Sequence, residues 1–598
     1  MAENYDPPVD ELSFVLDASA QWRRVLALPA FAHLDATLAG AILEEGARFC
    51  AGVLSPINHL GDEQGCVLEE GKVRVPAAFR AAYAAFVAGG WAGMDLPAEV
   101  GGQALPTTLA VAFSEMVNGA CVAFGMMGCM VRAGAHLILE HGEAEEAGRI
   151  ARELLSGEAG ATIVITEPQA GSDVAAIRTR AVPDGDGGGY RLTGSKIFIT
   201  CADQDYTGQI YHFVLAQAAA APGAAAASPS GAGLTLFMVP KRGPAADAAS
   251  PANGVAVLGL EKKMGLKASP TCAVAFDEAR GQRIGAEGRG LACMFTMMNL
   301  MRLEVAVQSV GIASAATQRA LRYAHERRQG GNRALPIVQH GDVRRMLVHM
   351  QAMTGAMRAL VLDVASTLDL ARHAPSAAER AAASDYVEFM LPICKAWMSD
   401  SAFQVANLGV QVMGGYGYVA DGGMEQYVRD SRVMAIYEGT NGIQAQDLLR
   451  RKLIKAGGRG HAVWLARMRE TLAPPVAGAT LASLRTALAA ALARFEAIST
   501  ELMQAEAVRL DLCAAWYLQW AGLLAGAWSS YRLAIAAAQG GGDDGTGADA
   551  AAGAAARLAT ARFYFDAILP ETDALESRIR AADASLAAAL AEALPAPA

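Results

Sequence analysis

The sequence has 598 residues, 53% of them hydrophobic, and a formal net charge of −10 at pH 7. A chain of this length can bury a large core and form several domains. The negative net charge argues against binding a nucleic-acid backbone as the main function, because such binding needs clustered cations. The nine cysteines include no CxxC pair, which is typical of reduced thiols in a cytoplasmic protein and not of a disulfide framework.

Two segments bear on targeting and on membranes. Residues 1–11 are acidic and lack a basic region followed by an apolar run, so we expect no secretory signal. The segment from Leu512 to Tyr531 carries no charge and is long enough to span a bilayer. It is either a membrane helix or a helix buried in an all-helical domain. Gln519 in its middle favours the buried helix, and we expect no integral membrane span.

Hydrophobic spacing divides the chain into an arm and four domains. Residues 1–35 form an N-terminal arm, and residues 36–160 repeat apolar positions at helical intervals. Residues 161–284 contain short β-rich runs separated by turns, which predicts a central β-domain. The helical pattern returns over residues 285–455, and residues 470–598 form a further helical domain.

Three stretches predict turns or flexible connections. Thr193-Gly194 within YRLTGSKIFIT predicts a tight hairpin. The low-complexity stretch at 218–233 predicts a loop between two strands. The glycine- and alanine-rich stretch at 540–556 has the composition of a flexible linker.

Common catalytic motifs are absent from the sequence. It has no GxGxxG after a strand, no Walker A loop, no GxSxG elbow and no HExxH. The spacing of histidines and cysteines predicts no metal site.

Two other motifs carry candidate chemistry. TEPQAGSDV at 166–174 offers the hydroxyls of Thr166 and Ser172, and Gly171 permits close backbone approach. Such a loop can hold a phosphate or a polar heterocycle, although an ordinary strand exit has the same composition. In AIYEGTNGIQ at 435–444, Glu438 is a single acid between an apolar run and a glycine-flanked turn. It is either an exposed turn residue or a carboxylate with a function.

Together with KIFIT at 196–200, KMGLKASPT at 263–271 and QVMGGYGY at 411–418, these motifs resemble the acyl-CoA dehydrogenase superfamily. The resemblance covers about residues 36–455. The chain length and C-terminal block look most like the long subgroup, which includes enzymes for 3-methylmercaptopropionyl-CoA and longer fatty acyl-CoAs. The implied fold is mainly α: a helical N-terminal domain, a β-barrel-like middle domain and a four-helix bundle, here with an extra C-terminal helical domain.

The resemblance also implies a reaction, the FAD-dependent α,β-dehydrogenation of an acyl-CoA thioester to the trans-2-enoyl-CoA. Glu438 would abstract the α-proton while flavin N5 takes the β-hydride. Electrons would pass to an electron-transfer flavoprotein. Two alternatives stay open at this point: an acyl-CoA oxidase that uses oxygen, and a DNA-associated flavoprotein of the alkylation-response branch.

Binding residues follow from the resemblance as well. Arg327 would reach the FAD of a neighbouring subunit, with Gln411, Gly414 and Gly415 at its adenosine half. Ser172, Arg302 and Gly439 would contact the substrate, although Arg302 can also be read as a helix-surface cation. The remaining FAD contacts would come from Ile163, Ile165, Thr166, Gly171, Ser172, Phe198, Ile199, Thr200, Thr440 and Asn441.

Two positions depart from the family pattern. Phe198 stands where the family often has tryptophan, so it keeps a ring but lacks the N–H donor. Lys267 stands where the long subgroup usually has histidine.

The C-terminal block bears on the choice among the alternatives. From Thr471 onward it has eight arginines, no lysine and thirteen acidic residues, a net formal charge of −5. Its arginines are dispersed, so we expect no nucleic-acid binding. Shorter family members bury comparable bundle surface by pairing dimers into tetramers. We therefore expect the block to cover that surface and leave a homodimer, in the cytoplasm.

Overall fold

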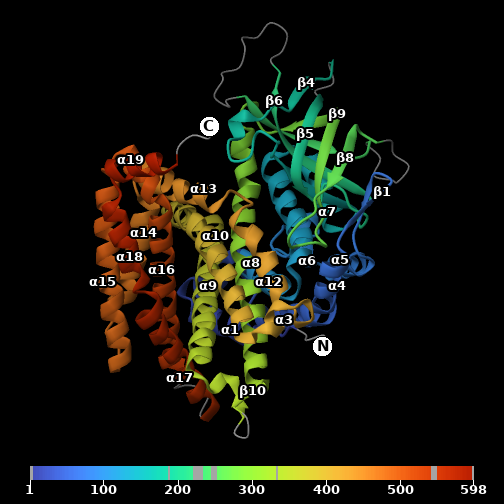
Figure 1. The fold of residues 1–598 in the computed structure, drawn as a ribbon. Coiled ribbons are helices and arrows are strands. Elements are labelled where there is room, and N and C mark those ends of the chain that lie inside the picture. Colours follow the sequence, from blue (N-terminus) through green and yellow to red (C-terminus); the bar gives the residue numbers. More distant parts are fainter. Residues whose placement is uncertain are drawn as a thin grey trace.

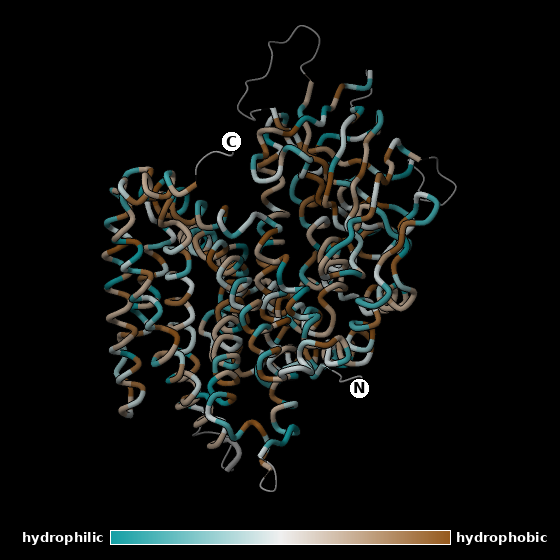
Figure 2. The backbone as a smooth tube through the Cα atoms, viewed as in Figure 1, coloured by the Kyte–Doolittle hydropathy of each residue, from teal (hydrophilic) through white to brown (hydrophobic). Residues whose placement is uncertain are grey.

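The structure is a computed structural model that describes residues 5–185, 189–219, 233–243, 252–330, 334–540 and 548–594. A β-domain stands at one end of a long helical bundle, and the C-terminal helices flank the bundle on the side away from the β-domain (Figure 1). Hydrophobic segments run through the strands and along the facing helices (Figure 2). The predicted fold class is confirmed.

The N-terminal region is helical apart from one short hairpin. α6 leaves helical geometry at Cys121 (φ −161°, ψ 95°), which divides it into two helices. α7 ends before Gly157, whose φ of 76° turns the chain toward the first long strand. The elements are α1 (Val9–Ala18), α2 (Ala20–Leu26), α3 (Ala36–Phe49), α4 (Asn58–Gln64), β1 (Val67–Glu69), β2 (Lys72–Arg74), α5 (Ala77–Ala88), α6 (Thr107–His141) and α7 (Ala144–Leu155).

The β-domain is a closed sheet. The strands are β3 (Ala159–Val164), β4 (Arg180–Pro183), β5 (Tyr190–Thr200), β6 (Gln209–Ala218), β7 (Leu234–Pro240), β8 (Val255–Leu260) and β9 (Thr271–Ile284). Pairing runs β6-β4-β5-β9-β7 and returns from β7 to β6, while β3 joins β6 and β8 joins β9. Because the pairing closes on itself, the middle domain is barrel-like, as predicted.

The hairpin predicted at Thr193-Gly194 is wrong. Both residues lie inside β5, where the register against β9 shifts between Leu192 and Gly194. Gly194 has φ 157°, and a Cβ there would lie 2.5 Å from Thr179 Oγ1. Glycine inside a strand is as typical of a bulge with close backbone approach as of a turn, and here it marks the bulge.

The bundle follows the sheet through α8 (Gly290–Glu326), α9 (Gly341–His373) and α10 (Ala377–Met413), with the short β10 (Arg328–Gln329) and β11 (Leu335–Pro336) between α8 and α9. Gly414, at φ 61°, ends α10 and separates it from α11 (Gly415–Tyr418). The glycine pair therefore lies at a junction between helices. The segment continues with α12 (Met424–Ser431), α13 (Asn441–Gln446) and a π-helix (Asp447–Lys455).

The added C-terminal domain packs its longest helix, α16 (Ala507–Gly540), against α9, α10 and α13. Trp520 and Trp528 are buried there, so the segment Leu512 to Tyr531 is a buried helix, as predicted. Six of the block's eight arginines pair with carboxylates, which leaves little charge for a phosphate backbone. The other helices are α14 (Arg459–Leu472), α15 (Ala479–Leu502), α17 (Ala548–Phe563), α18 (Glu571–Ala581) and α19 (Ala584–Ala593).

The flexible linker predicted at 540–556 is partly wrong. From Ala548 the chain forms α17, because alanine has the highest helix propensity of any residue. Residues 541–547 lie outside the described residues, as does most of the low-complexity stretch at 218–233.

Among the helices that the structure describes, α6 and α8 are long and apolar enough to cross a membrane. Their most apolar windows are 78% and 67% buried inside the protein, which is typical of core helices.

Lys267 joins three parts of the molecule. Its ammonium lies 3.4 Å from the carboxylate of Asp62 on α4, which also pairs with Arg429 on α12 at 2.6 Å. Next to it, the N–H of Leu266 donates to Asp430 at 2.6 Å. Lys267 thus links the middle domain to the N-terminal domain, while Leu266 and the Asp62–Arg429 pair continue the link to α12.

Candidate active site

Glu438 lies in a tight loop between the bundle and α13. Its φ is 57° and that of Gly439 is 85°. A non-glycine residue in this left-handed region is uncommon and persists only where its surroundings hold it. Gln444 donates to the Glu438 carbonyl at 3.1 Å, and the Thr440 hydroxyl caps α13 by accepting from the N–H of Ile443 at 3.3 Å.

The carboxylate of Glu438 is partly buried. Among the described residues, none donates a hydrogen bond to it. Burial raises its pKa above the ordinary value, and the cations of Lys395 and Arg302 oppose that rise without cancelling it. A carboxylate with a raised pKa is a stronger base, which suits it to general-base chemistry near neutral pH.

Lys395 on α10 belongs to the candidate site, and it was not identified from the sequence. It is fully buried, and its ammonium donates to the Gly439 carbonyl at 2.8 Å and to Asn441 Oδ1 at 3.0 Å. Burial lowers its pKa to about 7, and Glu438 opposes that effect. The signal that could have found it is a single lysine within the apolar run FMLPICKAWM at 389–398.

Arg302 on α8 is buried, with 5% of its surface exposed, so the reading as a helix-surface cation is wrong. Its Nη1 lies 3.3 Å from Asp447 Oδ2, at the start of the π-helix. Burial lowers the pKa of Arg302, while Asp447 and Glu438 raise it. Arg302 and Lys395 therefore lie among the carboxylates of Glu438, Asp447 and Asp400 in this part of the bundle.

The loop TEPQAGSDV is anchored by a buried ion pair. Glu167 accepts from the N–H groups of Arg178 at 2.7 Å and Thr179 at 3.0 Å, and lies 2.9 Å from the Lys196 ammonium. Lys196 also donates to the carbonyls of Ile165 and Leu215, each at 2.8 Å. Burial raises the pKa of Glu167, but these partners outweigh it and hold the pKa at about 2.

This anchoring sets the exposure of the predicted flavin residues. Thr166, Ile163 and Ile165 are partly buried, while Gly171 and Ser172 are exposed. The loop is therefore a fixed surface whose outer residues are open to a ligand.

KIFIT lies beside that loop, because the N–H of Ile197 donates to the Thr166 carbonyl at 3.0 Å. The register of β5 against β9 shifts between Lys196 and Ile199, and Phe198 within this bulge has φ 60° and is 60% exposed. An exposed aromatic ring held in an uncommon conformation is typical of a ligand surface. Thr200 is partly buried at the strand end.

Two predicted cofactor residues direct their side chains elsewhere. Ile199 is 2% exposed and belongs to the core of the sheet. The carboxamide of Asn441 donates to Asp400 at 2.8 Å and to the Ala396 carbonyl at 3.2 Å. Each of these residues has only its main chain left for a cofactor in this structure.

The residues predicted to contact the adenosine half form a separate group. Arg327 ends α8, and Gln411, Gly414 and Gly415 lie at the end of α10, all exposed. The two helix ends are adjacent, since the rings of Tyr323 and Tyr416 are 6.3 Å apart. From Arg302 to Arg327 an α-helix rises by about 37 Å, at about 1.5 Å per residue. This group thus lies at the end of the bundle away from α13 (Figure 1).

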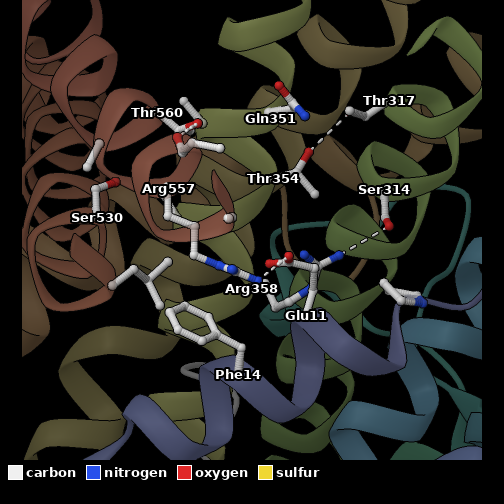
Figure 3. Close-up of a pocket in the computed structure, with 18 of the residues that line it drawn as sticks. Glu11, Phe14, Ser314, Thr317, Gln351, Thr354, Arg358, Ser530, Arg557 and Thr560 are labelled. Atoms are coloured by element: carbon white, nitrogen blue, oxygen red, sulfur yellow. Dashed lines mark hydrogen bonds and ion pairs between the residues drawn. The ribbon is translucent and has the colours of Figure 1, made fainter. Parts of the chain in front are cut away.

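A cavity of about 330 Å³ lies where α1, α8, α9, α16 and α17 meet (Figure 3). Arg557 there pairs with Glu11 at 2.5 Å and lies over the ring of Phe14. Arg358 donates to Ser314 at 3.1 Å and pairs with Glu115. No residue of the Glu438 loop lines this cavity, so it is a junction between the arm and the added domain and is separate from the candidate active site.

Four family descriptions match consecutive parts of the chain. They are the N-terminal domain (41–158), the middle domain (162–279) and the C-terminal domain (288–453) of acyl-CoA dehydrogenase, and an acetyl-CoA dehydrogenase C-terminal-like domain (464–589). The 3-methylmercaptopropionyl-CoA dehydrogenase of Ruegeria pomeroyi is 40% identical over 463 residues, covering 76% of this chain and 77% of the relative. The chain belongs to the acyl-CoA dehydrogenase family.

Other family members match most of the chain. A butyryl-CoA dehydrogenase of Syntrophomonas wolfei is 30% identical over 612 residues, covering 97% of this chain and 98% of the relative. The crystal structure of an acyl-CoA dehydrogenase from Bacillus anthracis, complexed with FAD, superposes with a TM-score of 0.73 at 21% identity. It covers 93% of this chain and 90% of that one.

Membership of the family makes the chain an oxidoreductase of an FAD-dependent class, as predicted. The exposed Phe198 ring and the anchored TEPQAGSDV loop fit such a cofactor, since they offer an aromatic face beside hydroxyl and main-chain groups. Within the described part of the chain, no group of three or more His, Cys, Asp or Glu side chains could hold a metal ion.

The anchoring ion pair can be tested by Lys196→Met. The change leaves the Glu167 carboxylate buried without its cation, so we expect the free energy of unfolding to fall by about 3–5 kcal/mol. Urea unfolding would measure the loss. Lys452→Met is the matched control, because Lys452 pairs with the exposed Glu388 at 2.7 Å and should cost about 0–1 kcal/mol. Equal losses in the two variants would contradict the anchoring role.

Proposed function

We propose that the chain dehydrogenates an acyl-CoA thioester between its α- and β-carbons, with Glu438 as the base that takes the α-proton. The observation that carries the proposal is the Glu438 carboxylate itself. It is partly buried, its pKa is raised, and no described residue donates to it. A base that removes a proton from a weakly acidic carbon needs both a raised pKa and oxygens that are free to accept the proton.

The surroundings of Glu438 support the proton transfer. Lys395 and Arg302 favour the charged form of the carboxylate, because both cations lower its pKa and oppose the effect of burial. Among the described residues, the main-chain N–H of Glu438 has no acceptor, so it is available to a thioester oxygen on which negative charge develops. An acyl chain that excludes water would raise the pKa of Glu438 further and strengthen the base.

We assign the FAD surface to the TEPQAGSDV loop and KIFIT. Thr166, Ser172 and Thr200 would donate or accept hydrogen bonds there, and Phe198 would cover a ring face. The main chains of Ile199, Thr440 and Asn441 would complete the contact. FAD, when bound, supplies the acceptor for the β-hydride. We further propose that electrons leave to an electron-transfer flavoprotein, as the family resemblance implies, and that the enzyme works in the cytoplasm.

We propose that the enzyme is a homodimer. The group at Arg327, Gln411, Gly414 and Gly415 lies at the end of α8 away from the β-domain that carries Thr166 and Phe198 (Figure 1), so we expect the two groups of one chain to serve different cofactors. A partner copy that supplies this group would complete each site. The added domain already packs α16 against α9 and α10, which covers bundle surface that would otherwise need burial.

The base assignment is tested by Glu438→Gln. Glutamine keeps the shape and removes the base, so kcat should fall by at least about two to four decades, the general-base contribution. Anaerobic mixing with a panel of acyl-CoAs, followed by the loss of flavin absorbance, would measure the step. FAD content and acyl-CoA affinity should stay near those of the parent.

The parent enzyme is the control in the same experiment. The rate at which its reduced flavin is re-oxidised also identifies the electron acceptor. After anaerobic reduction it should re-oxidise slowly in air and rapidly with an electron-transfer flavoprotein. Rapid re-oxidation in air would instead identify an oxidase. A Glu438→Gln variant that turns over like the parent would show that another residue is the base.

The pH dependence follows from the cations beside Glu438. The base works when deprotonated, so kcat/KM should fall as the pH drops through its raised pKa. Arg302→Gln removes a cation that lowers this pKa and leaves Asp447 less compensated, so the acid limb should move to higher pH. Arg302→Lys keeps the charge and should move the limb less. An acid limb that does not move in Arg302→Gln would remove Arg302 from the electrostatics of the base.

The dimer is tested by light scattering at several protein concentrations, with a gel-shift against duplex DNA at moderate salt. We expect the mass of two chains throughout and no shift. A tetramer would refute the covering role of the added domain. A salt-sensitive shift would contradict the assignment of its arginines to internal ion pairs.

A further inference from the structure

The catalytic loop is held from two helices that lie far from it in the sequence. Lys395 on α10 donates to the carbonyl of Gly439, the residue after the proposed base. Lys395 also donates to Asn441, whose carboxamide donates in turn to Asp400 at 2.8 Å. The side chain of Asn441 is thus hydrogen-bonded to both Lys395 and Asp400 of α10. These two bonds hold the Glu438 loop against that helix.

The second helix is α16 of the added domain. Gln519 Nε2 donates to Asp400 Oδ2 at 2.7 Å. This is the polar residue that interrupts the long apolar segment of α16, and the site residues described above leave it without a role. The two oxygens of Asp400 are divided between Asn441 on one side and Gln519 on the other. A continuous hydrogen-bonded path therefore runs from the added domain to the loop.

Nearby contacts keep α16 in place against the same region. Arg450, in the π-helix that follows α13, donates to the Ala507 carbonyl at 3.0 Å and pairs with Asp511 at the start of α16. α16 also packs directly against α13. The path through Gln519 is thus part of a docked interface between the loop region and the added domain.

The loop needs this support because its conformation is unfavourable in isolation. Glu438 has φ 57°, a region that a non-glycine residue adopts only when other contacts hold it there. Asp400 is partly buried, and burial raises its pKa, while Asn441, Gln519 and Lys395 lower it. Without the Gln519 donor, Asp400 loses one of the partners that keep it charged and directed at Asn441.

We propose that the added C-terminal domain holds the catalytic loop in its reactive conformation through Gln519, along the path Gln519–Asp400–Asn441 that also engages Lys395. Gln519 is a positioning residue, since it would act on the loop only through Asp400 and Asn441. The inference rests on the proposed role of Glu438 as the base. It gives the added domain a part in catalysis besides covering bundle surface.

The test is Gln519→Met, which keeps the length of the side chain and removes the donor. The rate of flavin reduction at saturating acyl-CoA should fall about tenfold or more, because a misplacement of about 1 Å can cost about 100-fold. The Kd for acyl-CoA should change little. With α-deuterated substrate, the isotope effect on flavin reduction should rise, since the α-proton step becomes more limiting.

Tyr517→Phe is the matched control on the same helix. It removes a buried hydrogen bond of 2.9 Å between Tyr517 and Ser499, inside the added domain and away from the loop. We expect it to lower the melting temperature but to leave the reduction rate and the isotope effect unchanged. Gln519→Lys, which returns a donor to Asp400, should recover part of the rate.

The path also predicts non-additivity. Asn441→Ala interrupts it nearer the loop, so Gln519→Met should have little further effect in that background. Should Gln519→Met not fold, Gln519→Asn retracts the donor by one methylene and should slow reduction in the same way. Reduction in the Gln519 variants as fast as in Tyr517→Phe would overturn the inference.

Glu438→Gln separates the two levels of inference. If that variant is inactive while the Gln519 variants match the control, the base assignment stands and only the positioning role fails. If Glu438→Gln is active, the base is another residue. The proposal that Gln519 positions the catalytic base then fails as well.

Discussion

The arrangement depends on keeping one carboxylate both charged and available in a partly buried place. Burial alone would favour the neutral form of Glu438. Lys395 and Arg302 offset that cost from two different helices, while neither pairs directly with the carboxylate. A direct ion pair would occupy the oxygens that a substrate proton must reach. The bundle instead directs the lysine to main-chain and amide oxygens, and the arginine to Asp447.

This arrangement places polar side chains in the protein interior, and each of them then needs a hydrogen-bond partner. The lysine requires the Gly439 carbonyl and Asn441, and Asn441 requires Asp400. Asp400 requires the donor that α16 supplies. The charge requirement at the loop thus extends outward through α10 to the added domain. In the β-domain, the buried pair of Glu167 and Lys196 holds the proposed cofactor loop by the same physics.

Several features could be predicted from the sequence because their signals are local. Strand and helix periodicity located the β-domain between helical regions, and motif order identified the family. Prediction failed where one local signal has two meanings. Gly194 fits a turn or a bulge, and the alanine-rich stretch from Ala548 fits a linker or a helix. Orientation has no local signal at all: the side chains of Ile199 and Asn441 turn into the protein, while their neighbours Phe198 and Gly442 are exposed.

The sequence by itself determined the fold class, the family and Glu438 as the candidate base, since each follows from residues adjacent in the chain or from motifs in a set order. Only the tertiary structure decided which groups surround that carboxylate. Lys395, Asp400 and Gln519 lie on helices far from the loop in sequence, and nothing in the sequence connects them with Glu438 or with one another. They become a network only because packing buries them together, where an unpaired polar group would be costly.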